Sequence, residues 1–297
     1  MRKFEISTDS NSDFYADEIE KYGIYVGKLN YTMTRNGETT EYFDDFKSYD
    51  EYVAFYNELR AGVVAKTSIL NLQAHIDLFT RMAEAGVKSA LHISQSAGLS
   101  PTIDNANRAI EIVKEKYPDI DYIAIESSTT TIGEQMLVLI ACDMRDNGAT
   151  NKETADYINS IKLNVQHFII ADDLKYLCRG GRVSPASAYL GSMLHIKPII
   201  EFSRKGKLEV THKSMGMKNA IKSCVEDFGK FTLNEKYPYV RIVHTDNLPM
   251  AQKVQDLFFE KYGIRPEIRI MGPIIGTHVG PNAVAFGFIT NQPRSAE

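Results

Sequence analysis

The first half of the chain repeats one pattern three times: a short apolar run, a polar turn and a stretch with helical periodicity. The apolar runs and their turns are KFEIS with TDSNSD, SALHIS with QSAGLSPT, and YIAIES with STTTIG. Strands that alternate with helices in this way indicate a parallel sheet with helices on both faces. Ligands of such sheets bind beyond the carboxyl ends of the strands. We therefore expect the three polar turns to lie along one edge of a parallel sheet.

A different pattern follows after about residue 160. Six apolar runs with the length of strands are separated by two long helical patterns, and residues 205–207 (KGK) are typical of a hairpin turn. In the first half, Asn36-Gly37 within the alternating residues 25–43 is a strong hairpin signal. The sequence predicts an α/β protein with two domains. Residues 1–160 form an N-terminal α/β domain with a parallel sheet and a hairpin insertion, and residues 161–297 form a C-terminal α+β domain with a mixed sheet.

Composition excludes several classes of partner. The formal net charge is -4 and no basic block occurs, so nucleic acid is not expected, because phosphate binding needs a clustered positive surface. No stretch of about 20 apolar residues exists, and the start MRKFEISTDS lacks the apolar run of a secretory signal, so we expect no membrane insertion. The cysteines Cys142, Cys178 and Cys224 are far apart and odd in number, which favours a reducing cytoplasm over disulfides.

The sequence also lacks the motifs of several reaction classes. The seven histidines are scattered and no HExxH occurs, so we expect no metal site. No GxGxxG follows the first strand, and neither a Walker loop nor a GxSxG motif is present. The chain carries hydroxyls, one well-placed histidine and two arginines, but no activated nucleophile. These residue types suit the binding of an anion better than catalysis of a covalent reaction. We therefore expect neither enzyme activity nor a cofactor.

The hydroxyl-bearing turns supply candidate anion-binding residues. Thr67 and Ser68 lie in AKTSILN, and QSAGLSPT offers Ser96, Ser100 and Thr102. A helix that begins after such a turn presents free amides and the positive end of its dipole, which can hold an anion. The same residue types are also ordinary helix caps, so a purely structural role stays open.

Two further segments place candidate functional side chains next to glycines. His278 lies in GTHVGPNAVAF, where glycines and a proline shape a tight backbone around it, although a structural histidine stays an alternative. In DLKYLCRGGRVS, Arg179 and Arg182 bracket Gly180 and Gly181, between the apolar strand HFIIA and a helix-like stretch, ASAYLGSML. The alternative for this segment is a helix C-cap at Gly180 with solvent-exposed arginines.

Together, six of these segments resemble the DegV family of bacterial fatty-acid-binding proteins, over nearly the whole chain. They are TDSNSD, Thr67-Ser68, GLSPT, DLKYLCRGGRVS, IKPII and HVGPNAVAFGF, in the family's order and with similar spacing. The pair YLxRGGR and HxGP is the most specific part of the resemblance. It implies two α/β-type domains with a long-chain fatty acid buried between them.

For the site, the resemblance implies that the hydroxyls of Thr67 and Ser100 hold the carboxylate and that His278 approaches the same head group. We add Ser96 and Thr102, from the same turn as Ser100, as further ligand-binding candidates. Some family members act as the acyl-carrying subunit of fatty acid kinase. There, a separate subunit with dihydroxyacetone-kinase-like domains transfers phosphate from ATP to the bound carboxylate. Arg179 and Arg182 would then face outward at the rim, toward this partner.

The chain departs from the family pattern in three loops. TSILN stands for TSQPS, LSPT for LSGT and HVGPNA for HxGPGA. Pro101 cannot donate an amide where glycine could, whereas Asn282 tolerates left-handed backbone angles. Two alternatives therefore stay open. One is a soluble binding protein for another small carboxylate or lipid, and the other is a stand-alone phosphotransferase or hydrolase.

Overall fold

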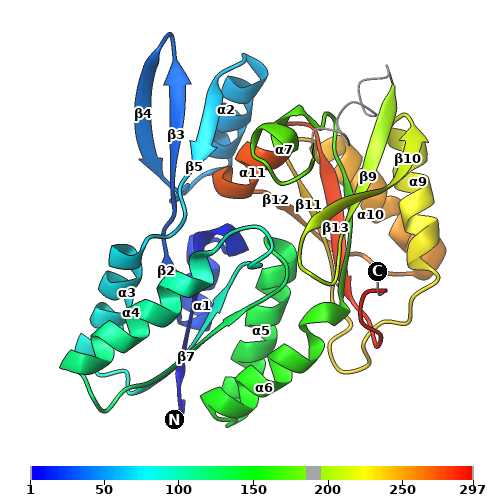
Figure 1. Cartoon of the computed structure of the whole chain (residues 1–297). Coiled ribbons are helices and arrows are strands. Elements are labelled where there is room, and N and C mark those ends of the chain that lie inside the picture. The colour runs from blue at the N-terminus through cyan, green and yellow to red at the C-terminus, as the bar shows by residue number, and fades with distance from the viewer. Residues whose placement is uncertain (1, 185–194, 296–297) are drawn as a thin grey trace.

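The structure, a computed structural model, describes residues 2–184 and 195–295, so the helix-like stretch expected at residues 186–194 lies outside the described part. The described chain contains a parallel four-stranded sheet, a small three-stranded sheet and a mixed six-stranded sheet (Figure 1). This arrangement confirms the predicted α/β class. Within the described residues, no helix has both the length and the apolar character needed to cross a membrane.

The parallel sheet belongs to the N-terminal half and has the strand order β2-β1-β6-β7. Its elements are β1 (Glu5–Asp9), η1 (Ser10–Ser12), α1 (Ala16–Tyr22), β2 (Ile24–Gly27), α3 (Leu72–Glu84), β6 (Ser89–Ser94), α4 (Thr102–Lys116), β7 (Asp121–Glu126), α5 (Ile132–Asp146), α6 (Asn151–Ile161) and η2 (Lys162–Asn164). Successive side chains of a strand point to opposite faces. Accordingly, Ala90 packs with α3 and α4, whereas Leu91 and Ile93 pack with α5 and α6. Helices therefore cover both faces, as the alternation predicts.

The predicted hairpin is part of a larger insertion between β2 and α3. It comprises β3 (Asn30–Arg35), β4 (Glu38–Phe43), α2 (Tyr49–Arg60) and β5 (Val64–Thr67), with the antiparallel order β4-β3-β5. Asn36 and Gly37 have φ angles of 51° and 85°, the left-handed conformation that a two-residue hairpin turn requires. Strand β5 ends at Thr67 and thereby fixes the position of this candidate residue.

The C-terminal sheet has the order β10-β9-β8-β13-β11-β12, and only β11 and β12 pair in parallel among its described pairs. Its elements are β8 (Val165–Ile170), α7 (Lys175–Arg179), β9 (Ile196–Phe202), β10 (Leu208–Met215), α9 (Met217–Phe228), β11 (Val240–His244), α10 (Leu248–Tyr262), β12 (Glu267–Ile270), α11 (Pro273–Val279) and β13 (Val284–Ile289). Helices α9 and α10 pack on one face. The short helices α7 and α11 pack on the other face, and the predicted mixed sheet is confirmed.

Two contacts help to hold the two halves together. Tyr56 of the insertion lies in an apolar cluster with Ile274 of α11, and its hydroxyl donates to the carbonyl of Met271 at 2.7 Å. Arg269 of β12 is buried and makes two hydrogen bonds to the Glu18 carboxylate of α1, at 2.9 and 2.5 Å. A buried ion pair that has lost one partner is strongly destabilising, so this contact favours one fixed arrangement of the halves. The predicted domain boundary near residue 160 stays a prediction.

Candidate functional site

The three polar turns meet at the carboxyl edge of the N-terminal sheet, as predicted. Asp9 at the end of β1 accepts a hydrogen bond from Ser94 Oγ at the end of β6, at 2.6 Å. Asn11 donates to Thr130 Oγ1 at 3.1 Å and to Glu134 at 2.7 Å, which links the first turn to the third. All five side chains are buried. Burial, followed by the Asp9 charge, raises the pKa of Glu134 well above its ordinary value.

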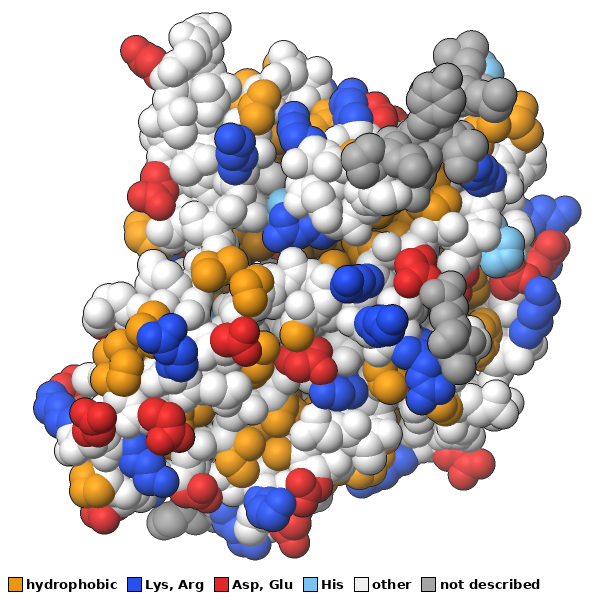
Figure 2. Space-filling view, in the orientation of Figure 1, with side chains coloured by type: hydrophobic (Ala, Val, Ile, Leu, Met, Phe, Trp, Pro, Cys, Tyr) orange, Lys and Arg blue, Asp and Glu red, His pale blue; other side chains and the backbone are white. Residues whose placement is uncertain are grey.

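A cavity lies between this edge and the face of the C-terminal sheet that carries α7 and α11. It holds about 780 Å³ of space between atoms, part of it open to solvent. Apolar side chains from both halves form most of its wall, among them Leu29, Leu99, Ile169, Leu177, Phe202 and Ile274. Hydrophobic side chains are visible in the hollow between the two halves of the molecule (Figure 2). The wall suits an apolar ligand.

One part of the wall is polar, and it contains three predicted site residues. Thr67, Ser100 and His278 all line the cavity, although they come from β5, the turn before α4, and α11. Thr67 Oγ1 lies 2.8 Å from His278 Nε2, within hydrogen-bond distance. Thr67 and His278, more than 200 residues apart, therefore meet directly, and Ser100 lines the same cavity. That the three bind a ligand stays a prediction.

His278 is held in its neutral form. Burial, followed by the positive charges of Arg182 and Arg179, lowers its pKa to about 4. Its Nδ1 atom is buried and has no hydrogen-bond partner among the described residues. An anion placed beside this imidazole would raise the pKa of His278, because a nearby negative charge favours the protonated ring.

The two arginines differ in their surroundings, and the expectation that both face a partner stays a prediction. Arg182 lines the cavity beside His278, is partly buried, and donates to the carbonyl of Gly180. Burial lowers its pKa, as expected for a charge with reduced hydration. Arg179 is exposed, with its guanidinium 5.1 Å from the centre of the Tyr176 ring. Among the described residues that line this cavity, Arg182 therefore carries the one positive charge.

The paired glycines serve two different purposes. A Cβ atom on Gly180 would lie 2.2 Å from His278 Nδ1, so only glycine lets the imidazole pack against this turn. Gly181 has open space around it but a φ angle of 72°, which residues with a side chain adopt at a cost. The first glycine thus permits close contact, and the second permits the turn itself.

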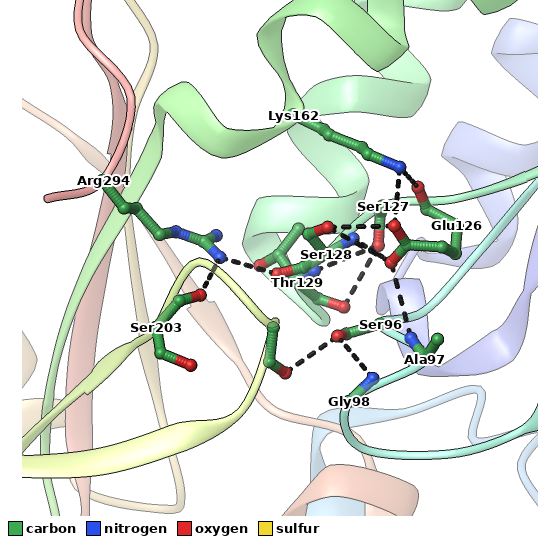
Figure 3. A network of polar contacts seen from close by, with 11 residues as sticks. Ser96, Ala97, Gly98, Glu126, Ser127, Ser128, Thr129, Lys162, Ser203 and Arg294 are labelled. Carbon is green, nitrogen blue, oxygen red and sulfur yellow. Dashed lines mark hydrogen bonds and ion pairs between the residues drawn. The ribbon is translucent and has the colours of Figure 1, made fainter. Parts of the chain in front are cut away.

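Ser96 and Thr102, the two added candidates, are not among the residues that line the cavity. Ser96 Oγ donates to the carbonyl of Gly206 in the β9–β10 turn at 2.8 Å and accepts from the Gly98 amide at 3.1 Å (Figure 3). Thr102 Oγ1 is buried without a hydrogen-bond partner in the described part of the chain. Both residues therefore lie outside the cavity wall, and their role in ligand binding stays a prediction.

The Ser96 contact belongs to a larger polar network between the two halves (Figure 3). Glu126 of β7 accepts from Lys162 Nζ at 2.6 Å and from the Ser128 amide at 2.7 Å. Arg294, near the end of the described chain, donates to the carbonyls of Ser128 at 2.8 Å and Ser203 at 3.2 Å. This network joins the polar turns of the N-terminal half to the C-terminal half.

Sequence reasoning missed several polar residues of the wall. Gln95, Thr130 and Thr131 line the cavity, and all three belong to the polar turns that marked the edge. His167 also lines it, from the buried strand β8, and a polar residue directly before the apolar run at residues 168–170 was the available signal. Burial lowers the pKa of His167 well below its ordinary value, and the charge of Arg294 lowers it further.

The departures from the family loops leave the polar cluster in place. Ser100 keeps its position on the cavity wall directly before Pro101, and Ile69 of TSILN adds an apolar side chain to the wall. Asn282 has a φ angle of 67°, which confirms that asparagine takes over the left-handed position in this loop. The changed loops therefore alter the surroundings of the cluster more than the cluster itself.

Comparison with known proteins agrees with this architecture. A family model described as an uncharacterised protein of the DegV family matches residues 3–291. A DegV domain-containing protein of Clostridium perfringens is 31% identical over 297 residues, covering 99% of this chain and 100% of the relative. A solved Thermotoga maritima protein, described as revealing a fatty acid binding function, has a TM-score of 0.81 and 26% identity, covering 98% of this chain and 100% of that one. A fatty acid binding DegV family protein from Streptococcus agalactiae has a TM-score of 0.80, 26% identity and the same coverage.

The Gly180 contact can be tested with a matched pair of substitutions. Gly180→Ala should displace the His278 imidazole from Thr67, because the new Cβ would overlap with Nδ1. Gly181→Ala should cost about 1 kcal/mol of stability through its left-handed backbone but leave His278 in place. Crystal structures of both variants and chemical denaturation would separate the two effects. An undisplaced imidazole in Gly180→Ala would contradict the role given to this glycine.

Proposed function

Because the chain belongs to the DegV family, we propose that it binds a long-chain fatty acid in the cavity between its two halves. The observation that carries the proposal is an apolar cavity with a polar cluster of Thr67, Ser100, His278 and Arg182 on its wall. The fatty acid binding described for the Thermotoga maritima and Streptococcus agalactiae proteins supports the same ligand class.

The two unlike ends of a fatty acid match the two parts of the wall. Burial of an acyl tail contributes about 0.8 kcal/mol per methylene, so the apolar wall supplies most of the affinity. A carboxylate buried without donors would cost several kcal/mol. In this proposal, the hydroxyls of Thr67 and Ser100 donate to the carboxylate, and Arg182 supplies a compensating positive charge. Neutral His278 completes the cluster and becomes easier to protonate once the anion is bound.

We further propose that the chain presents this fatty acid to a separate kinase subunit, without catalysing the transfer itself. A surface groove lined by Lys66, Arg179 and Arg182 also contacts Thr67 and His278, so a basic surface adjoins the polar cluster. Guanidinium groups suit phosphate and acidic partner surfaces. The cysteines are all free, which fits a role in the cytoplasm. The sequence carries no phosphate-binding loop, which argues against a stand-alone phosphotransferase.

A second candidate ligand is a lipid or small carboxylate with another polar group. Gln95, Thr130, Thr131 and His167 add hydrogen-bonding groups to the cavity wall. His167 Nδ1 is buried with no partner among the described residues, so a ligand that donates a hydrogen bond would satisfy it. The mass of the bound ligand distinguishes this candidate from an unsubstituted fatty acid.

Ligand identity is tested by native mass spectrometry of protein purified from a bacterial host, followed by lipid extraction. The wild-type chain should carry a stoichiometric long-chain fatty acid. Thr67→Val/Ser100→Ala should lower its affinity roughly 100-fold or more, because each lost hydrogen bond to a charged group costs about 1.5–3 kcal/mol. Ser96→Ala is the control, since Ser96 does not line the cavity. Equal lipid retention in the double variant and the control would refute the assigned head-group site.

The presentation role is tested by acyl-phosphate formation with a purified fatty acid kinase catalytic subunit. Arg179→Ala should lower the rate at least about tenfold while lipid stays bound, because an exposed charge-assisted contact to the partner is lost. Lys175→Ala, an exposed cation on the same helix, is the matched control. If both variants lose the same activity, general basic charge rather than Arg179 is responsible. ATP turnover by the chain alone would instead favour a stand-alone enzyme.

A further inference from the structure

A second cluster of chemically reactive side chains lies inside the N-terminal half, away from the residues that line the cavity. Asp9 at the end of β1, His75 of α3 and His92 of β6 are buried, with exposed fractions of 0%, 0% and 1%. Asp9 Oδ1 lies 3.5 Å from His92 Nε2 and 3.9 Å from His75 Nε2. The three ligand atoms all lie within 4.8 Å of one another.

The three atoms that face each other have no hydrogen-bond partner among the described residues. His75 Nδ1 lies 3.1 Å from the backbone carbonyl of Asn71, which can only accept, so Nδ1 carries the ring proton. The neutral His75 ring therefore directs a bare Nε2 lone pair at the Asp9 carboxylate. Unsatisfied buried polar atoms are costly, and a cation between the Asp9 carboxylate and this lone pair would satisfy both.

The outer contacts of the same side chains hold them in this orientation. Asp9 Oδ2 accepts hydrogen bonds from Ser94 Oγ and the Gln95 amide, which leaves Oδ1 free to face the histidines. His92 Nδ1 lies 3.0 Å from Ser7 Oγ. Phe79 packs against both imidazole rings, with ring centres 5.9 Å from His75 and 5.4 Å from His92. Histidines that ligate metals characteristically bond through their other nitrogen to a carbonyl or similar group, inside an apolar shell.

We propose that Asp9, His75 and His92 bind a divalent transition-metal ion, with Zn²⁺ as the best match. Two imidazole nitrogens and one carboxylate oxygen are a characteristic zinc ligand set, completed by a water as the fourth ligand. Tetrahedral ligands about 2.0–2.1 Å from zinc lie about 3.4 Å apart. That spacing is slightly less than the 3.5 and 3.9 Å measured between the carboxylate and the two rings.

The ion would join β1 to two segments that lead to the cavity wall. Asp9 also anchors the start of the QSAGLSPT turn through Ser94 and the Gln95 amide. Asn71, whose carbonyl orients His75, is the last residue of the TSILN loop and caps α3. Because the ligands come from a strand end, a helix and a second strand, no local spacing in the sequence reveals them. The proposed role is structural, and it does not depend on the identity of the lipid.

The test uses untagged full-length protein, stripped of metal with a chelator, then either dialysed against Zn²⁺ or Co²⁺ or refolded in their presence. We expect one ion per chain by elemental mass spectrometry and a thermal midpoint that rises with Zn²⁺. The Co²⁺ protein should show the intense visible absorption of a tetrahedral site. His75→Gln and His92→Gln should each lower affinity at least about 100-fold, since a direct ligand is lost.

His212→Gln, which removes an exposed histidine on β10, is the matched control and should bind metal like the wild type. The Co²⁺ spectrum of the wild type decides the question even if the buried variants fail to fold. Substoichiometric metal in the wild type after both loading routes would overturn the proposal. Equal metal content in His75→Gln and the wild type would also overturn it, because the ion would then lie elsewhere.

Discussion

The hydrogen bond between Thr67 and His278 is the contact on which the polar cluster depends. It joins the end of β5 in the insertion to α11 in the C-terminal half, 211 positions away in the sequence. Each partner reaches this contact only because larger elements are in place: the insertion packs on α11, and Gly180 leaves room for the imidazole. The cluster is therefore a product of the tertiary fold, and no single loop carries it.

The cavity exists only when the two halves are docked. Its wall takes Leu29 and Leu99 from one half and Ile169 and Phe202 from the other. Three separate contacts fix the docking: the Tyr56 cluster, the Arg269–Glu18 pair and the network around Glu126 and Arg294. Interfaces between domains commonly permit relative motion. An apolar ligand buried between the halves would itself add to the docking, because it binds only the closed arrangement.

The sequence predicts the class of fold and three residues of the polar cluster because these depend on local patterns. Alternating strands and helices, Asn36-Gly37 and the loop motifs of Thr67, Ser100 and His278 are all readable within a few residues. Side-chain direction is not readable in this way. Ser96 donates to Gly206, 110 positions away, and Arg182 lines the cavity next to His278 of the distant helix α11. The Asp9, His75 and His92 cluster escaped detection for the same reason.

The proposal that a carboxylate binds beside a buried, neutral histidine is tested most directly by the pKa of His278. Histidine NMR titrations of lipid-free and oleate-loaded protein would measure it, with the His278→Gln variant used to assign the signal. The account predicts a pKa of about 4 without lipid, because burial and the arginines disfavour the charged ring. It predicts a clearly higher pKa with oleate bound, because the anion stabilises the imidazolium. An unchanged pKa in fully loaded protein would place the carboxylate elsewhere and contradict the account.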